Sequence, residues 1–305
     1  MLGRKRLFAA LVAVGSLALL AAGCGGGGGN KSATTTQSTT NGAAIAAPAN
    51  IKSAGKIVFC TDITYPPEEF YQGSKPTGSD IDIGNNIATR MGVKAQFDNT
   101  GFDGIIAALL AKKCDAIISG MNNTAERRKQ VNFVNYINVG QSFMIQKGNP
   151  KHVTNVASLA GKSASVEVGT TNKDWLDQQS KTLQSQGKKP IKVVTFPKDT
   201  DAASALKAGR VDSYFGDSPV VSYYISKDPS AFQVASHPQV VNPIPVGIAL
   251  RKDETDLQTA IQKAVSAMYA AGTMQKILSK WEMSGAAMKT SSGGGGGSAP
   301  ATIIG

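Results

Sequence analysis

The sequence predicts an α/β protein made of two similar units, in which mostly parallel sheets are flanked by helices. Short apolar, β-branched runs alternate with amphipathic segments along the 305 residues, which is the order of a parallel α/β sheet. Residues 108–120 also align without a gap on residues 205–217, and both segments contain a helix end, a turn, an Asp and a buried strand. Two extended hydrophobic stretches, 139–146 and 245–251, bracket the second unit and are typical of paired crossovers between lobes. The chain between the polar termini is long enough for two modest lobes or for one large α/β domain.

The start of the chain has the order of a secretory signal. Positive residues at 4–6 precede an apolar run, 7–22, which is too short for a stable transmembrane helix, and Cys24 follows. The ending 20–24 resembles a bacterial lipobox, although Ala21 stands where a Leu, Val or Ile is usual. We therefore expect a signal peptide at 1–23 and a lipid on Cys24. The mature protein would then be anchored to the outer face of the cytoplasmic membrane, in the periplasm or the cell-wall space.

Polar, glycine-rich arms flank the region that can form a core. Residues 24–50 and 287–305 contain almost nothing to bury, so we expect a flexible linker and a flexible tail. The formal charge is +11, or +8 without the three positive residues of the signal. These charges are scattered and form no basic stripe. This argues against a nucleic-acid partner and favours solubility and attraction to an anionic membrane or wall.

In the first unit, polar residues follow the predicted strands. We expect a strand at 56–60, an extended loop at 61–67, a helix at 81–91 capped by Ser79 or Asp80, a strand at 93–97, a helix at 105–113 and a strand at 116–118. Two prolines in the loop forbid a helix, so the loop presents Asp62 and Tyr65. Tyr65, and Phe102 on a later glycine-flanked turn, either line a cleft or pack against a neighbouring element.

The strand at 116–118 is followed by the densest group of candidate binding residues. Ser119, Gly120 and Asn122 lie at its carboxyl end, the edge of an open α/β sheet at which ligands bind. Thr124 is a candidate N-cap, which would put Arg127 one turn into a short helix. The planar guanidinium of Arg127 suits a carboxylate, although a surface arginine at a helix start fits the spacing equally well.

The second unit repeats this pattern. We expect a strand at 163–169, a helix from 170 to 184, a strand at 191–196, a helix at 199–208, a strand at 211–215 and a helix at 218–225, followed by C-terminal helices at 253–271 and 273–281. Thr170 and Thr171 open a helix whose free N–H groups suit an anion. Asp217 follows the strand that is equivalent to 116–118. If both strands end at one cleft, Arg127 and Asp217 approach one ligand from opposite walls.

Four stretches in the correct order resemble the family of extracytoplasmic solute-binding proteins that serve polar amino acid uptake by ABC transporters, the bacterial solute-binding protein family 3. The stretches are 61–67, 102–104, 115–127 and 168–171 together with Asp217, and the resemblance covers about 51–285. It implies a two-lobe, type II periplasmic-binding-protein fold, with lobe 1 at 51–139 plus 244–286 and lobe 2 at 140–243. It also implies a monomer that captures a free amino acid, with polar or cationic ones favoured, and delivers it to a membrane permease.

The resemblance further implies a role for each candidate residue. By that resemblance, Arg127 grips the ligand α-carboxylate with support from Asn122, Thr170 and Thr171, Asp217 takes the α-amino group with Ser119 and Gly120, Tyr65 and Phe102 sandwich the aliphatic stem, and Asp62 reaches toward the side chain. The chain departs from the family pattern at Glu68 and Glu69, where an aromatic residue usually precedes the acid, and at Asn122 and Asn123. An alternative for the acidic loop is that its own backbone N–H groups satisfy Asp62 while Glu68 points to solvent.

Two other functions compete with amino acid binding. One is a periplasmic dehydratase-like enzyme that acts on a cyclic carboxylate, and the other is a surface sensor or adhesin lipoprotein. The sequence contains two histidines, His152 and His237, and no Ser/His/Asp arrangement or metal-binding motif. We therefore expect no catalytic residue, no metal and no cofactor.

Besides Cys24, which we expect to carry the lipid, the sequence contains Cys60 and Cys114. They could be oxidised outside the cell. However, Cys60 lies at the end of its strand and Cys114 at the start of the neighbouring one, so parallel pairing would separate them beyond disulfide reach. We expect two buried thiols.

Overall fold

The computed structural model describes residues 45–235 and 241–288, which all belong to one compact unit. The expected signal peptide, Cys24, most of the expected linker and nearly all of the expected tail lie outside the described residues, as does His237. Residues 45–50 of the expected linker are described. There, Ile45 N donates a hydrogen bond to Arg90 O, and helix α1 begins at Ala49. No helix in the described part is both long and apolar enough to cross a membrane.

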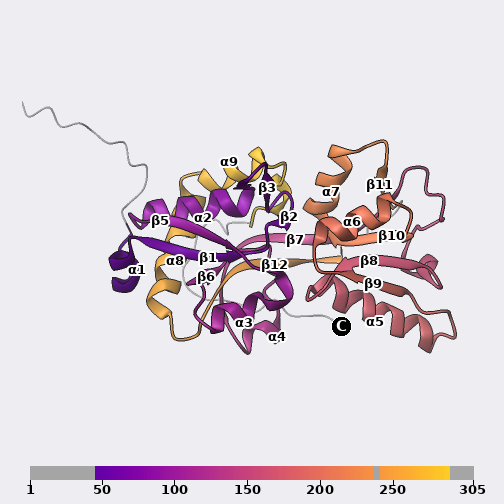
Figure 1. Cartoon of the computed structure of the whole chain (residues 1–305), viewed down its shortest axis with the longest axis horizontal. Coiled ribbons are helices and arrows are strands. Elements are labelled where there is room, and N and C mark those ends of the chain that lie inside the picture. The colour runs from indigo at the N-terminus through magenta and orange to yellow at the C-terminus, as the bar shows by residue number, and fades with distance from the viewer. Residues whose placement is uncertain (1–44, 236–240, 289–305) are drawn as a thin grey trace, which may run out of the picture. The chain divides into compact units, whose positions relative to one another are not determined.

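The elements alternate as expected for an α/β protein (Figure 1). In the first part of the chain they are α1 (Ala49–Ala54), β1 (Lys56–Thr61), β2 (Thr64–Tyr65), β3 (Glu69–Gln72), β4 (Lys75–Thr77), α2 (Ser79–Arg90), β5 (Lys94–Asn99), α3 (Ile105–Leu110), β6 (Ala116–Ile117), α4 (Ala125–Arg128) and β7 (Asn132–Gln146). They continue with β8 (Ser163–Glu167), α5 (Thr171–Ser185), β9 (Lys192–Phe196), α6 (Asp199–Lys207), β10 (Ser213–Asp217), α7 (Ser218–Lys227), β11 (Phe232–Val234), β12 (Val241–Leu250), α8 (Thr255–Ala270) and α9 (Thr273–Lys280). Short 3-10 helices lie at Phe102–Gly104, Val156–Leu159 and Ser284–Ala286.

One hydrogen-bonded sheet runs through the described chain in the order β5-β1-β6-β12-β7-β10-β8-β9, with β11 paired to β7. Strands β5, β1 and β6 are parallel to one another, as are β10, β8 and β9. Strands β7 and β12 are antiparallel to each other and join the two parallel sets. We call the half with β1, β5 and β6 lobe 1 and the half with β8, β9 and β10 lobe 2. This two-lobe α/β fold, with two crossover strands, is the predicted one.

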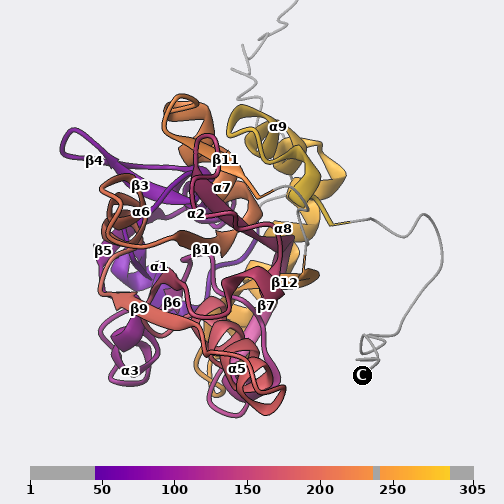
Figure 2. The same cartoon turned by 90° about the vertical axis from the view of Figure 1, so that its right-hand side faces the viewer.

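Each lobe packs helices on both faces of its part of the sheet (Figures 1 and 2). In lobe 1, helices α2, α8 and α9 bury one apolar cluster and α3 buries another on the opposite face. Strand β1 shows the alternation, because Phe59 enters the first cluster and Cys60 the second. In lobe 2, helices α6 and α7 cover one face and α5 covers the other.

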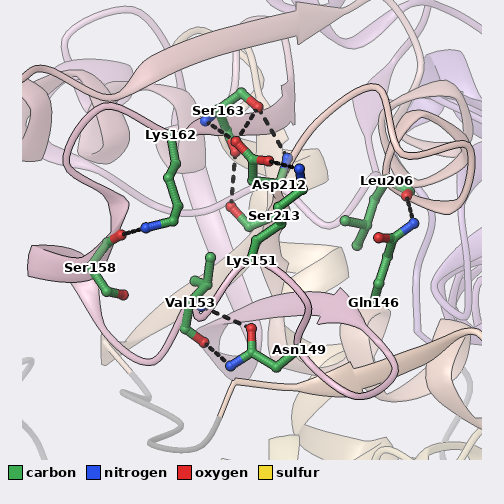
Figure 3. Close-up of polar contacts among 10 residues, drawn as sticks. All are labelled: Gln146, Asn149, Lys151, Val153, Ser158, Lys162, Ser163, Leu206, Asp212 and Ser213. Atoms are coloured by element: carbon green, nitrogen blue, oxygen red, sulfur yellow. Dashed lines mark hydrogen bonds and ion pairs between the residues drawn. The ribbon is translucent and has the colours of Figure 1, made fainter.

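The internal repeat corresponds to a repeated contact. In lobe 1, Asp115 precedes β6, and its Oδ2 accepts a hydrogen bond from Val58 N of β1 at 2.8 Å. In lobe 2, the equivalent Asp212 precedes β10, and its Oδ2 accepts from Ser163 N of β8, also at 2.8 Å (Figure 3). Lys151 lies 3.6 Å from the other Asp212 oxygen. Each aspartate thus ties the start of one strand to its parallel neighbour.

The expectation of two free thiols is wrong, because Cys60 and Cys114 form a disulfide. Their Cα atoms lie 5.6 Å apart. Cys60 pairs with Ile117 in the sheet, but residues 111–115 form a turn rather than an extension of β6. The error was to extend the strand backward, since the turn brings Cys114 back to the end of β1.

One local expectation in lobe 1 also needs correction. Neither Ser79 nor Asp80 caps α2. Both lie inside the helix, and Gly78 precedes it without a side-chain cap. The extended loop expected at 61–67 contains β2, which forms a three-stranded antiparallel sheet with β3 and β4, two strands for which the sequence analysis had no expectation. That small sheet carries Glu69 into the protein interior.

Candidate functional site

All ten residues predicted to bind a ligand line one pocket between the lobes. Its cavity volume is about 10 Å³, so the side chains of the two lobes lie close together across it. Its lining is Asp62, Tyr65, Phe102, Ser119, Gly120, Asn122, Arg127, Glu167, Thr170, Thr171, Asn172 and Asp217. Glu167 and Asn172 are the two that the sequence analysis missed.

The pocket lies where parallel strands of both lobes end. Asp62 follows β1 and Ser119 follows β6, whereas Glu167 and Asp217 are the last residues of β8 and β10. The carboxyl ends of parallel strands leave unpaired backbone and side-chain groups at one edge, which is why such edges bind ligands. Ser119 and Asp217 line the same pocket, so both repeated strands end at this one cleft.

Arg127 is held firmly at the pocket wall. Thr124 caps α4, and its Oγ1 accepts from Arg127 N at 3.2 Å, as the spacing predicted. The guanidinium donates to Asn122 O at 2.9 Å and, across the pocket, to Gly169 O of lobe 2 at 3.1 Å. It also lies 5.3 Å from the centre of the Phe102 ring. Burial lowers the pKa of Arg127, but a guanidinium keeps its charge, and its remaining N–H groups can serve a ligand.

Asn122, Thr170 and Thr171 lie next to this arginine. Thr171 Oγ1 donates to Asn122 Oδ1 at 2.6 Å, a second bond between the lobes, while Asn122 Nδ2 is buried without a partner. Thr170 caps α5, because its hydroxyl accepts from Lys173 N and donates to Glu167 O. The Thr170 hydroxyl is therefore occupied, so the helix start can offer its backbone rather than this side chain.

Asp217 faces Arg127 from lobe 2. Its side chain is buried, and Oδ1 has no hydrogen-bond partner. Burial raises the pKa of Asp217 to about 7, while the nearby Tyr65, Asn172 and Arg127 act to lower it. The charged form of a carboxylate in this setting is stabilised when a cationic donor enters the pocket.

Two further acids, Asp62 and Glu167, occupy another part of the pocket. Asp62 accepts from the side-chain hydroxyl of Thr64 at 2.7 Å and from Phe102 N at 2.8 Å, so neither partner is a backbone N–H group of its own loop, as one alternative had expected. Glu167 is buried beside it, with Oε1 unpartnered. Burial, followed by the charges of Asp199 and Asp62, raises the pKa of Glu167 to about 10. Burial also raises the pKa of Asp62. Glu68, which one alternative directed to solvent, is 1% exposed.

The two aromatic residues differ in their surroundings. Phe102 lies under the Arg127 guanidinium. Tyr65 lines the pocket and also packs against the apolar cluster of α6 and α7 in lobe 2. Tyr65 is therefore both a residue of the cleft wall and a packing residue.

The signal for Glu167 was present in the sequence. It ends a predicted strand just as Asp217 does, so the strand-end rule applied to β8 would have found it. Asn172 follows the helix start at Thr171 and accepts a short hydrogen bond from Gln141 of β7. Only that contact with a distant strand distinguishes Asn172 from an ordinary residue of a first helical turn.

Two lobes joined by two crossover strands, with a polar pocket at the strand ends between them, define a binding protein of the periplasmic type II class. The chain belongs to the bacterial extracellular solute-binding proteins, family 3, which match residues 57–284. Within the described chain no cluster of His, Cys, Asp and Glu could hold a metal ion.

Several known proteins are similar over most of their length. The chain is 33% identical over 233 residues to ABC transporter arginine-binding protein 1 of Escherichia coli K12, covering 75% of this chain and 91% of that protein. It is 30% identical to the histidine-binding periplasmic protein of Salmonella typhimurium LT2, covering 74% and 87%. Among solved structures, an ancestral arginine-binding protein bound to arginine has 35% identity and a TM-score of 0.68, covering 74% of this chain and 98% of that one.

Proposed function

We propose that this protein binds a free α-amino acid between its lobes and delivers it to the permease of an ABC importer. Relatives named for arginine, histidine and cystine binding support the ligand class, and the names of the arginine and histidine relatives refer to ABC transport and to the periplasm. The observation that carries the proposal is the approach of Arg127 and Asp217 to one buried pocket from opposite lobes. An amino acid zwitterion needs a cation at one end and an anion at the other, in a space from which water is largely excluded.

The proposed contacts follow from the hydrogen-bond donors and acceptors of the pocket that have no partner within the protein. Arg127 binds the α-carboxylate, and the unpartnered Nδ2 of Asn122 donates to the same group. Asp217 accepts from the α-ammonium, next to Ser119 and Gly120. The aromatic rings of Tyr65 and Phe102 flank the aliphatic stem, while the starts of α4 and α5 supply backbone donors.

We further propose that the bound side chain is cationic. Asp62 and Glu167 come from opposite lobes, and each shifts the pKa of the other. Two buried carboxyl groups this close hold a proton between them unless a cation takes its place. A guanidinium or ammonium would displace that proton and satisfy Glu167 Oε1, whereas an apolar side chain would leave the pair as it is.

Calorimetry tests both proposals with arginine, lysine, histidine, glutamine, leucine and glutamate at one pH. The expected order puts the cationic ligands first. Glu167→Gln should lower the affinity for the ligand arginine by about 10- to 100-fold and the affinity for the ligand glutamine by much less, because only arginine loses a charged partner. Asp201→Asn, an exposed substitution on α6, is the matched control and should change nothing. Tightest binding of leucine or glutamate would contradict the cationic assignment.

The lobe boundaries and the membrane anchor belong to the same proposal. We assign lobe 1 to 51–139 plus 244–286 and lobe 2 to 140–243, closing about β7 and β12 because the ligand contacts both lobes. A smaller radius of gyration in solution scattering at saturating ligand is expected, and an unchanged value would contradict closure. Lipidation of Cys24 would keep the mature chain in the membrane fraction, and Cys24→Ala would release it.

A dehydratase activity is the second candidate, and Glu167 favours it. A protonated carboxyl in a dry pocket is the group that can donate a proton to a leaving hydroxyl. One neighbour of known structure, AncCDT-1, is described as an ancestral amino acid-binding protein and a precursor of cyclohexadienyl dehydratase, with 30% identity and a TM-score of 0.68. Binding without turnover remains our proposal. Turnover of a prephenate-like acid that Glu167→Gln abolishes would replace it.

A further inference from the structure

A buried acidic cluster lies directly behind the turn formed by Ser119 and Gly120. It consists of Glu69 on β3, Asp80 on α2 and Tyr136 on β7, with Glu68 beside them. All four side chains are buried, with exposures of 0–1%, and none of them lines the ligand pocket. The Ser119–Gly120 turn is therefore the bonded link between the cluster and the pocket.

Both carboxyl groups are bonded to that turn. Ser119 Oγ donates to Glu69 Oε1 at 2.8 Å and accepts from Asp62 N at 2.9 Å. Gly120 N donates to Asp80 Oδ2 at 2.9 Å, and Gly120 has the left-handed φ of 47°. Tyr136 completes the set by donating its hydroxyl to Asp80 at 2.7 Å. These bonds fix the position of the turn from the side opposite the pocket.

The cluster contains no cation to balance its acids. The groups that act on Glu69 are Asp80, Glu68 and Ser119, and those that act on Asp80 are Gly120, Tyr136 and Glu69. Across the lobes, Asp217 and Asp199 add further negative charge near Glu68. Two adjacent carboxylates in this environment would repel each other strongly. The unpartnered Oε2 of Glu69 is the atom that can hold a proton and donate it to Asp80.

We propose that Glu69 and Asp80 are positioning residues that share one proton, and that this proton keeps the Ser119–Gly120 turn in its ligand-binding geometry. The inference rests on the proposed function, in which this turn lies next to the ligand α-ammonium. With the proton present, Glu69 donates to Asp80 while its Oε1 still accepts from Ser119. Without it, two negative charges meet and the turn is pushed away from one of them.

The direction of the pH effect follows from the two groups. Burial raises the pKa of Asp80 to about 6 and raises that of Glu69 well above its ordinary value. The pair therefore loses its first proton near pH 6 and its second at a higher pH. Ligand affinity should fall when the pH rises through the raised pKa of Glu69, because the second proton is then lost.

Glu69→Gln is the decisive variant. A glutamine amide donates permanently to Asp80 through Nε2 and still accepts from Ser119 through Oε1, so it imitates the protonated acid. Calorimetry with L-arginine at about pH 6.5 and at a clearly alkaline pH should give similar affinities for wild type and variant at the lower pH, and a loss toward the higher pH that is about tenfold larger for the wild type. Glu69→Ala should bind weakly at both pH values, because the bond to Ser119 is absent.

Glu68→Gln is the matched control, since Glu68 is an adjacent and equally buried acid that makes no bond to the turn. Because Glu68 also acts on Glu69, this variant should show a loss of affinity as steep as that of the wild type, displaced in pH but not flattened. The amide resonance of Gly120 gives a readout without any ligand, and it should shift with alkaline pH in the wild type but not in Glu69→Gln. A Gly120 resonance that titrates identically in both proteins overturns the inference, as does a Glu68→Gln profile as flat as that of Glu69→Gln. Failure of every amino acid to bind overturns the proposed function instead, and the Gly120 titration still decides on the shared proton.

Discussion

Gly169 is the position where a single methyl group tests whether close contact of the lobes is needed for binding. It lies in lobe 2 with a φ of +78°, and a Cβ added there would come within 2.9 Å of Asp103 Cα in lobe 1. Backbone atoms cannot give way as the end of a flexible side chain can. Gly169→Ala therefore forces the lobes apart at this point, in addition to straining the local backbone.

The two effects have separate magnitudes. An alanine in the left-handed region costs about 1–2 kcal/mol of stability, or roughly 2–8 °C in melting temperature for a protein of this size. Separation of the lobes also lengthens the 3.1 Å bond from Arg127 to Gly169 O. A hydrogen bond to a charged group contributes about 1.5–3 kcal/mol, which corresponds to a loss of about 10- to 150-fold in affinity.

Gly187→Ala separates these contributions. Gly187 has a similar φ of +73°, but an added Cβ there would meet nothing within 4 Å. Both variants should lower the melting temperature to a similar degree, whereas only Gly169→Ala should lower the affinity for arginine measured by calorimetry. Equal affinities for the two variants would refute the argument that contact between the lobes at Gly169 supports binding.

Four further predictions concern the pocket, the pH dependence of stability and the disulfide. Arg127→Ala should weaken the binding of arginine by about 2–5 kcal/mol in calorimetry, with little change in melting temperature. The affinity of Arg127→Lys should lie between those of the wild type and the alanine variant. A loss of affinity below about threefold in Arg127→Ala would contradict the carboxylate contact. Asp217→Asn should weaken amino acids more than their des-amino analogues, and equal losses would make Asp217 a structural residue. Because the pKa of Asp217 is raised from 3.8 to about 7, its contribution to stability is present at low pH and is lost as pH rises through about 7, so melting temperatures of the Asn variant should fall less over that range. Replacing both Cys60 and Cys114 by Ser should cost about 4 kcal/mol in denaturant unfolding, since the bridge spans 54 residues, and an unchanged midpoint would show that the bridge is absent in solution.

Much of the site follows from rules that apply to a short stretch of chain. The repeat of 108–120 at 205–217, the cap at Thr124 and the strand ends at Ser119 and Asp217 are all visible in the residue order. Strand ends of parallel units meet at one edge, so residues there could be grouped without knowing any long-range contact. The same rule would have included Glu167.

The sequence by itself determined the alternation of strands and helices, the two related lobes and most of the pocket lining, because periodicity and strand-end position are properties of neighbouring residues. The tertiary structure alone decided which acids are buried together. Glu69 and Asp80 looked like a loop residue and a helix cap, and Cys60 and Cys114 looked too far apart to pair. Their chemistry depends on the elements that pack over them from distant parts of the chain, since desolvation and charge repulsion act through space and not along the sequence.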